Sequence, residues 1–291
     1  MTTRRLLAAA LAFQREAGAD EAIADTSIDR FAAFREETAK KAATRTAASA
    51  PSTPGSSVAP RASRGLKAGA DAPVAAGVAA GAGTEAGAGD AAAIAARAES
   101  LEALASALQA FDAPAAKALK DGATRFVFAD GRSGARLMIV GEAPGQEEDR
   151  QGRPFVGRAG QLLDRMLAAI GLDRQAEDPR RAAYIANILP WRPPGNRTPT
   201  EAEAAAFLPF IERHIALAAP EVLLLLGNTP LRALMGQTGG ITRARGQWRR
   251  HAPTGVETIA SFHPAYLLRT PGKKREAWAD LLEIAARLDL R

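Results

Sequence analysis

Glycines and carboxylates are concentrated in residues 141–157, whose sequence is GEAPGQEEDRQGRPFVG. This segment directly follows the apolar stretch 136–140. Gly141 and Gly145 would let the main chain approach a ligand closely, and Pro144 would stiffen the turn. The acidic side chains, which could hold a water molecule or stabilise a cation, are Glu142, Glu147, Glu148 and Asp149. A tight strand-to-helix turn with a solvated acidic end is the plainer alternative.

Three further polar segments follow along the chain. Asn187 stands at the end of an expected strand, 183–189. RPPGNRTPT occupies residues 192–200, and HPAYLLR occupies residues 263–269. Ligands of open parallel sheets bind beyond the carboxyl ends of the strands. We therefore expect these segments and residues 141–157 to meet at one edge of a sheet.

The elements that position these residues alternate between short apolar runs and longer amphipathic runs. This alternation predicts a three-layer α/β/α domain with a mostly parallel central sheet. The expected strands are 136–140, 183–189, 221–226 and 257–261, and the expected helices are 94–111, 159–170, 200–217, 229–235 and 275–288. A capping-box pattern at Thr198, Pro199 and Glu201 marks one expected helix start.

Composition divides the chain into three parts. We expect a helical leader over residues 1–36 and the α/β domain over residues 94–291. Residues 37–93 are dominated by Ala, Gly, Ser, Thr and Pro, and cannot bury enough apolar surface to order themselves. They are therefore expected to form a disordered linker. Residues 1–13 resemble a short secretory signal, but the charged residues that follow favour an amphipathic helix and a cytoplasmic protein.

Composition also excludes several kinds of site. The chain has no cysteine, which excludes disulfides, thiolate nucleophiles and cysteine-held iron–sulfur clusters. With three histidines in total, a multi-histidine metal site is not expected either. No apolar run is long enough for a transmembrane helix. The formal net charge is +6, and the excess of basic residues lies entirely after residue 111, which suits a polyanionic partner.

The glycine-rich segment 141–157, the central Asn187 and HPAYLLR at 263–269 resemble, in this order, the uracil-DNA glycosylase superfamily. The resemblance covers about residues 124–287 and is specific to the family-4 branch. It implies an enzyme that hydrolyses the N-glycosidic bond of deoxyuridine in DNA, releases uracil and leaves an abasic site. The implied partner is uracil-containing DNA, and we expect a monomer.

The resemblance also assigns roles at the base. Phe155 is similar to the aromatic residue that stacks on a flipped base, Asn187 to the residue that recognises the uracil edge, and His263 to the donor to uracil O2. Gly141 and Ala143 complete the expected uracil-binding set. A core phenylalanine, a strand-end asparagine and a packed histidine are the structural alternatives.

The DNA-binding residues implied by the resemblance lie in the two remaining segments. Leu267 and Leu268 would enter the duplex, and basic side chains beside them would contact phosphates. The full expected set is Arg192, Asn196, Arg197, Tyr266, Leu267, Leu268, Arg269 and Lys273. A capping loop of ordinary packing is the alternative.

The catalytic carboxylate is less directly indicated. The best-known branch of the superfamily has Asp where this chain has Ala143, so a general base at that position is excluded. Glu142 and Glu147 are the favoured candidates for holding a water or the cationic sugar, together with His263 as the catalytic donor. Residues 239–248 contain no histidine, which disfavours covalent capture of the sugar and favours a monofunctional enzyme.

Family-4 proteins normally hold a four-iron cluster through four cysteines. The corresponding positions here fall near Pro114 and Lys117 and at Trp191 and Phe207. We therefore predict no cofactor, with the aromatic side chains filling the space of the cluster. Two alternative functions stay open: a non-catalytic protein that binds uracil or abasic DNA, and a nucleotide-binding enzyme, which is disfavoured because the loop lacks a Lys-Ser/Thr pair.

Overall fold

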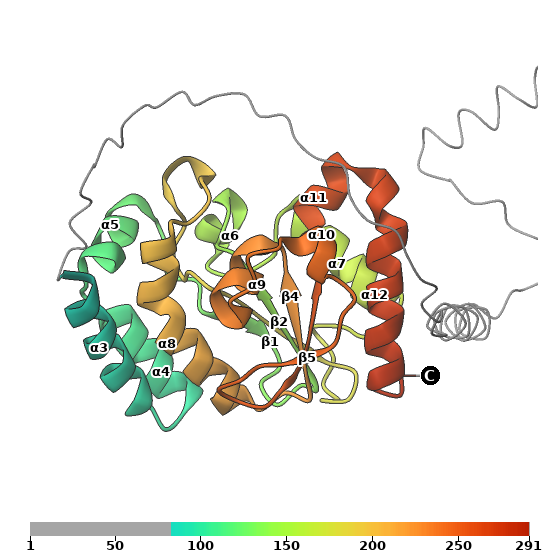
Figure 1. The fold of residues 1–291 in the computed structure, drawn as a ribbon, viewed down its shortest axis with the longest axis horizontal. Coiled ribbons are helices and arrows are strands. Elements are labelled where there is room, and N and C mark those ends of the chain that lie inside the picture. Colours follow the sequence, from blue (N-terminus) through green and yellow to red (C-terminus); the bar gives the residue numbers. More distant parts are fainter. Residues whose placement is uncertain (1–82, 291) are drawn as a thin grey trace, which may run out of the picture. The chain divides into compact units, whose positions relative to one another are not determined.

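The computed structural model describes residues 83–290. They form an α/β domain around a six-stranded sheet with strand order β1-β3-β2-β4-β6-β5 (Figure 1). The four central strands are parallel, and the edge strands β1 and β5 are antiparallel to their neighbours. The strands are β1 (Ala129–Gly131), β2 (Leu137–Gly141), β3 (Ala183–Asn187), β4 (Val222–Leu226), β5 (Arg249–Arg250) and β6 (Glu257–Ser261). The predicted fold class is confirmed.

Helices cover both faces of this sheet. They are α3 (Gly83–Ala96), α4 (Leu101–Ala110), α5 (Pro114–Gly122), α6 (Gln146–Gln151), α7 (Arg158–Ala168), α8 (Glu201–Ala218), α9 (Asn228–Met235), α10 (Ile241–Ala244), α11 (Pro264–Arg269) and α12 (Lys274–Arg287). Figure 1 shows α3, α4 and α8 on one side of the strands and α7 and α12 on the other. The four predicted central strands and the predicted helices over 159–170, 200–217, 229–235 and 275–288 are all present, within two residues at most of their ends.

Alternate side chains of β2 enter the two halves of the core. Met138 and Val140 join the cluster that contains α4 and α8, whereas Leu137 and Ile139 join the cluster that contains α7 and α12. All four side chains are fully buried. A strand covered on both faces is expected to be an uninterrupted apolar run, and LMIV fits this rule.

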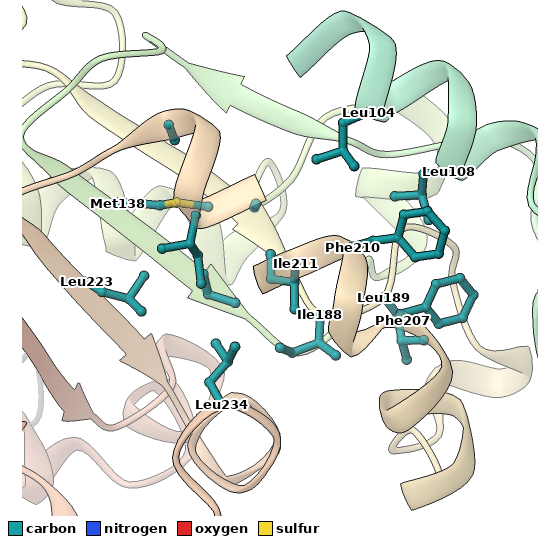
Figure 2. Packing of buried hydrophobic residues seen from close by; sticks show 14 of the residues in the cluster. Leu104, Leu108, Met138, Ile188, Leu189, Phe207, Phe210, Ile211, Leu223 and Leu234 are labelled. Carbon is teal, nitrogen blue, oxygen red and sulfur yellow. The ribbon is translucent and has the colours of Figure 1, made fainter. Parts of the chain in front are cut away.

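The core between α8 and the sheet contains the two aromatic residues expected at the cluster positions. Trp191 and Phe207 are both buried, and their ring centroids lie 5.9 Å apart. Phe126 lies 5.2 Å from Trp191, and Phe111 lies 6.0 Å from Phe207. Figure 2 shows Phe207 and Phe210 of α8 beside Leu108 of α4 and Leu189 after β3. Aromatic packing therefore occupies this region.

Two boundaries differ from the sequence expectation. The linker was expected to extend to residue 93, but α3 begins at Gly83, and Ala91 and Ala95 are buried. Small alanine side chains let α3 pack closely on α8, which composition alone does not indicate. The expected helix 94–111 is instead two helices, because Ser100 caps the start of α4 by accepting a hydrogen bond from the Ala103 N–H at 3.1 Å. The leader and most of the linker lie outside the described residues.

The capping box of α8 is also displaced from its expected position. The N-cap is Thr200, whose Oγ1 accepts from the Glu203 N–H at 3.1 Å while the Thr200 N–H donates to Glu203 at 2.8 Å. Arg197 forms a further ion pair with Glu203 at 2.6 Å. Glu203 therefore binds both Thr200 and Arg197. The N-cap is Thr200 for this reason, two residues after Thr198, where the sequence pattern predicted it.

Several short elements were not predicted. They are the edge strands β1 and β5 and the helices α5, α6, α10 and α11. Most are too short for hydrophobic periodicity to be visible in the sequence. No helix in the described part of the chain is both long and apolar enough to span a membrane.

We predict that Phe207→Ala lowers the free energy of unfolding by about 3 to 5 kcal/mol, because the ring is almost fully buried and its loss leaves a cavity. Leu268→Ala is the control, since this side chain is exposed and its removal should change stability by less than about 0.5 kcal/mol. Urea denaturation measures both. Equal midpoints for the wild type and Phe207→Ala would contradict the packing described here.

Candidate active site

The carboxyl ends of β2, β3, β4 and β6 surround a cavity of about 790 Å³. Its lining includes Ala143, Phe155, Asn187, Thr229 and His263. β3 and β4 lie on opposite sides of β2, so the cavity opens at the point where the strand order reverses. The convergence predicted from the sequence is thus observed for the segments after β2, β3 and β6.

Asn187 and Phe155 form one wall of the cavity. Asn187 is 7% exposed, and its Oδ1 is buried without a hydrogen-bond partner in the described part of the chain. Gly141 lies beside Asn187 in the parallel register. A Cβ at Gly141 would stand 2.5 Å from both Asn187 Oδ1 and the Phe155 ring, so only glycine leaves room for these side chains.

His263 also lines the cavity, next to Phe155. Its ring centroid lies 5.4 Å from that of Phe155, with an angle of 31° between the planes. Nδ1 accepts a hydrogen bond from the Ala265 N–H at 3.1 Å, which leaves the proton of the neutral ring on Nε2. Loss of hydration lowers the pKa of His263 to about 4, with the positive charge of Arg269 acting in the same direction. The side chain is therefore a neutral N–H donor at neutral pH.

Glu142 is the carboxylate that joins two strands at the cavity. It follows β2, lines the cavity and accepts a hydrogen bond from Thr229 Oγ1 at 2.6 Å. Thr229 follows β4, so this bond joins the two strands at the reversal of strand order. A carboxylate oriented in this way can stabilise positive charge or hold a water in the cavity.

The other acidic residues of the segment have different positions. Glu147, one of the two favoured candidates, is exposed on α6, pairs with Arg150 at 2.8 Å and does not line the cavity. Glu148 does line it, but its carboxylate accepts from the N–H groups of Gly145, Val156 and Gly157. The structure therefore brings Glu142, and not Glu147, to the cavity.

Asp149 is buried away from these groups. Its Oδ1 accepts hydrogen bonds from the Thr124 and Arg125 N–H groups, at 2.7 Å and 2.9 Å. A carboxylate bound in this way fixes the chain before β1 and has no access to the cavity. Its position is explained by the fold alone.

The expected DNA-contacting residues separate into two groups. Asn196, Arg197, Tyr266 and Arg269 line the cavity mouth. Leu268 is 37% exposed and is the one exposed large apolar side chain among the described residues. These positions fit the expected contacts with a nucleic acid.

The remaining members of the set have structural contacts. Leu267 is 1% exposed and packs with Phe262 and Leu162, so it is not available to enter a duplex. Lys273 pairs with Glu276 at 2.5 Å, and Arg192 donates to Asn196 at 2.6 Å. Neither cation lines the cavity.

Comparison with known proteins agrees with this geometry. A family model described as "Uracil DNA glycosylase superfamily" matches residues 128–282. This chain belongs to that superfamily. A Type-4 uracil-DNA glycosylase of Thermotoga maritima is 43% identical over 150 residues, which cover 50% of this chain and 73% of that protein. A Type-4 enzyme of Pyrobaculum aerophilum is 39% identical over 50% of this chain and 74% of its own length. One of Archaeoglobus fulgidus is 37% identical over 55% and 81%.

The sequence did not point to several of the residues that line the cavity. Thr229 was treated only as part of a helix start, although it binds Glu142. Asn228 and Thr242 also line the cavity, and Asn228 Oδ1 accepts from the Ile241 N–H at 2.7 Å. The signal that could have found Asn228 and Thr229 is their place just after the predicted strand 221–226, where ligands of parallel sheets bind.

We predict that the His263 imidazole stays neutral at pH 6 and titrates near pH 4, because the site disfavours the cation. An NMR titration of the ring nitrogens measures both the midpoint and the tautomer, which should carry its proton on Nε2. The resonance missing from His263→Ala gives the assignment. A midpoint near the ordinary value of about 6.5 would contradict the enclosed environment.

Proposed function

We propose that this protein is a monofunctional uracil-DNA glycosylase. It hydrolyses the N-glycosidic bond of deoxyuridine in DNA, releasing uracil and leaving an abasic site. The observation that carries the proposal is the buried Asn187 Oδ1, which has no hydrogen-bond partner among residues 83–290, in a cavity lined by Phe155 and His263. Similarity to relatives named Type-4 uracil-DNA glycosylase supports it.

The proposed cavity distinguishes uracil from cytosine through Asn187. Uracil presents an N3–H donor beside the O4 acceptor, and a carboxamide can accept from the first while donating to the second. Cytosine presents the reversed pattern and would leave buried polar groups unpaired. Phe155 would stack on the flipped base, Ala143 would leave space for it, and Gly141 leaves room for the Phe155 ring itself.

Bond cleavage would move the electron pair of the C1′–N1 bond onto the uracil, and negative charge would grow on O2. The neutral His263 Nε2–H would donate a hydrogen bond to that oxygen, in a site where little water competes. Glu142 would stabilise the cationic sugar and hold the attacking water. Water addition at C1′ releases a proton and gives the abasic sugar, and the uracil anion takes up a proton on release.

We also propose that the protein performs this reaction without the iron–sulfur cluster of the Type-4 branch. A four-iron cluster needs four thiolates, and the chain has no cysteine. The residues at the corresponding positions do not fit the cluster, since Trp191 and Phe207 offer no thiolate and their aromatic rings pack near each other. Lys120 lies 5.0 Å from the Trp191 ring centroid and donates to the Phe111 carbonyl, which ties α5 to this packing.

Iron content tests the cluster proposal. We expect purified protein to be colourless, to contain no stoichiometric iron by elemental analysis, and to be active without added metal. Growth in iron-rich medium is the control for incomplete loading. Stoichiometric iron together with visible absorbance would contradict the proposal.

Glu142→Gln and Glu147→Gln form a matched pair within one segment. Glu142 lines the cavity, whereas Glu147 faces solvent beside Arg150, so only Glu142→Gln should lose uracil release, by about a hundredfold. The measurement is free uracil from an oligonucleotide with uracil opposite guanine. Equal losses in both variants would contradict the placement of Glu142. Tight binding of this DNA without any uracil release by the wild type would favour the non-catalytic alternative.

Asn187→Asp should lose uracil release by about a hundredfold or more, because a carboxylate has only acceptors and repels both O4 and the growing charge. His263→Ala should cost a similar factor without changing the choice of base, since O2 is common to uracil and cytosine. Release of both bases by each variant is measured. Wild-type uracil release by Asn187→Asp would show that the base is wrongly placed.

A further inference from the structure

Phe155 has a main-chain conformation that is unfavourable for a residue with a side chain. Its φ is 53°, in the left-handed region. The chain is also confined there, because a Cβ at Gly160 would lie 1.8 Å from the Phe155 carbonyl oxygen. Such a conformation persists only where other contacts hold it.

Arg174 supplies two of these contacts, while Glu148 binds the N–H groups that follow. Its Nη1 donates to the Pro154 carbonyl and its Nη2 to the Phe155 carbonyl, each at 2.9 Å. The residue is 7% exposed and belongs to the loop between α7 and β3. One rigid guanidinium therefore binds two successive carbonyl groups and fixes the rotation of the peptide between them.

Two carboxylates complete the environment of this cation. Asp130 of β1 lies 3.1 Å from Nη1, and Asp164 of α7 lies 2.8 Å from Nε and 2.7 Å from Nη2. The guanidinium thus donates four hydrogen bonds, and its Nη2 also forms an ion pair with Asp164. A lysine could make at most three of these contacts and could not span both carbonyls in one plane.

We infer that Arg174 is a positioning residue for the base-stacking ring of Phe155. The inference rests on the proposed function, because it assigns Phe155 to the flipped uracil. Without the guanidinium the peptide after Pro154 can rotate, and the ring leaves its place beside His263. Misplacement of about 1 Å at a reacting group can cost on the order of a hundredfold in rate.

A double-mutant cycle tests this role. Arg174→Lys, Phe155→Ala and the double variant are compared for kcat and KM on uracil-containing DNA. Arg174→Lys should lower kcat at least tenfold with little change in KM, and should cost nothing further when Phe155 is already Ala. For Arg174→Ala, millimolar guanidinium should restore part of kcat.

The matched control is Arg136→Ala. Arg136 makes a similar fork, to Glu221 at 2.7 Å and to the Leu288 carbonyl at 2.6 Å, at the opposite end of the sheet. It should lose stability but keep kcat. Additive losses in the cycle, or wild-type kcat in a folded Arg174→Lys protein, would overturn the inference. If Arg174→Ala does not fold, the Lys variant alone decides by the same criteria.

Crystal structures separate this inference from the proposed function. Phe155 should leave the left-handed region in Arg174→Lys while keeping it in Arg136→Ala. This result would stand even if the wild type released no uracil, in which case the proposed function alone would fail. An unchanged Phe155 in the Arg174→Lys structure would overturn the positioning role itself.

Discussion

The constraint on which this cavity depends is the amide oxygen of Asn187, which is buried and finds no partner in the part of the chain that the structure describes. Leaving such a group unpaired costs about 1 to 3 kcal/mol, so a fold keeps one only where the surrounding structure prevents its satisfaction. Here the parallel register of β2 and β3 places Gly141 beside Asn187. The Cβ of any larger residue at position 141 would lie only 2.5 Å from Asn187 Oδ1. The sheet thereby keeps a polar atom available to a ligand that can donate to it.

The cavity and the aromatic packing occupy different parts of the domain. The cavity uses only the carboxyl ends of the central strands, whereas the aromatic cluster around Trp191 and Phe207 lies between α8 and the sheet. Because dense apolar packing can replace other means of holding helices together, this region can be stabilised by rings instead of a ligand. Its contribution to the cavity is indirect, through the position of the chain that follows β3.

Sequence patterns predicted the central strands, and brought Glu142, Asn187 and His263 to one edge, because residues at strand ends share that edge. The patterns were wrong on short helices, where two neighbouring side chains point in different directions. Successive helical residues point about 100° apart, so Glu147 faces solvent while Glu148 binds main-chain N–H groups, and Leu267 is buried while Leu268 is exposed. Arg174 gave no signal, since its contacts are with main-chain carbonyls and with residues distant in sequence.

The main chain near each of the two rings, Phe155 and His263, is held by buried polar contacts. Arg174 binds the carbonyls at Phe155, and two residues before His263 the hydroxyl of Ser261 donates to Asp280 at 2.6 Å, where Arg245 also binds at 3.0 Å. Desolvation raises the pKa of Asp280 to about 6, so at neutral pH this carboxylate is ionised and remains an acceptor for both partners. Hydrogen-bond donors stabilise a transition state most when they need no rearrangement as charge develops. The buried ion pairs flanking the cavity are therefore best understood as fixing its geometry, because pairs of this kind add little to stability by themselves.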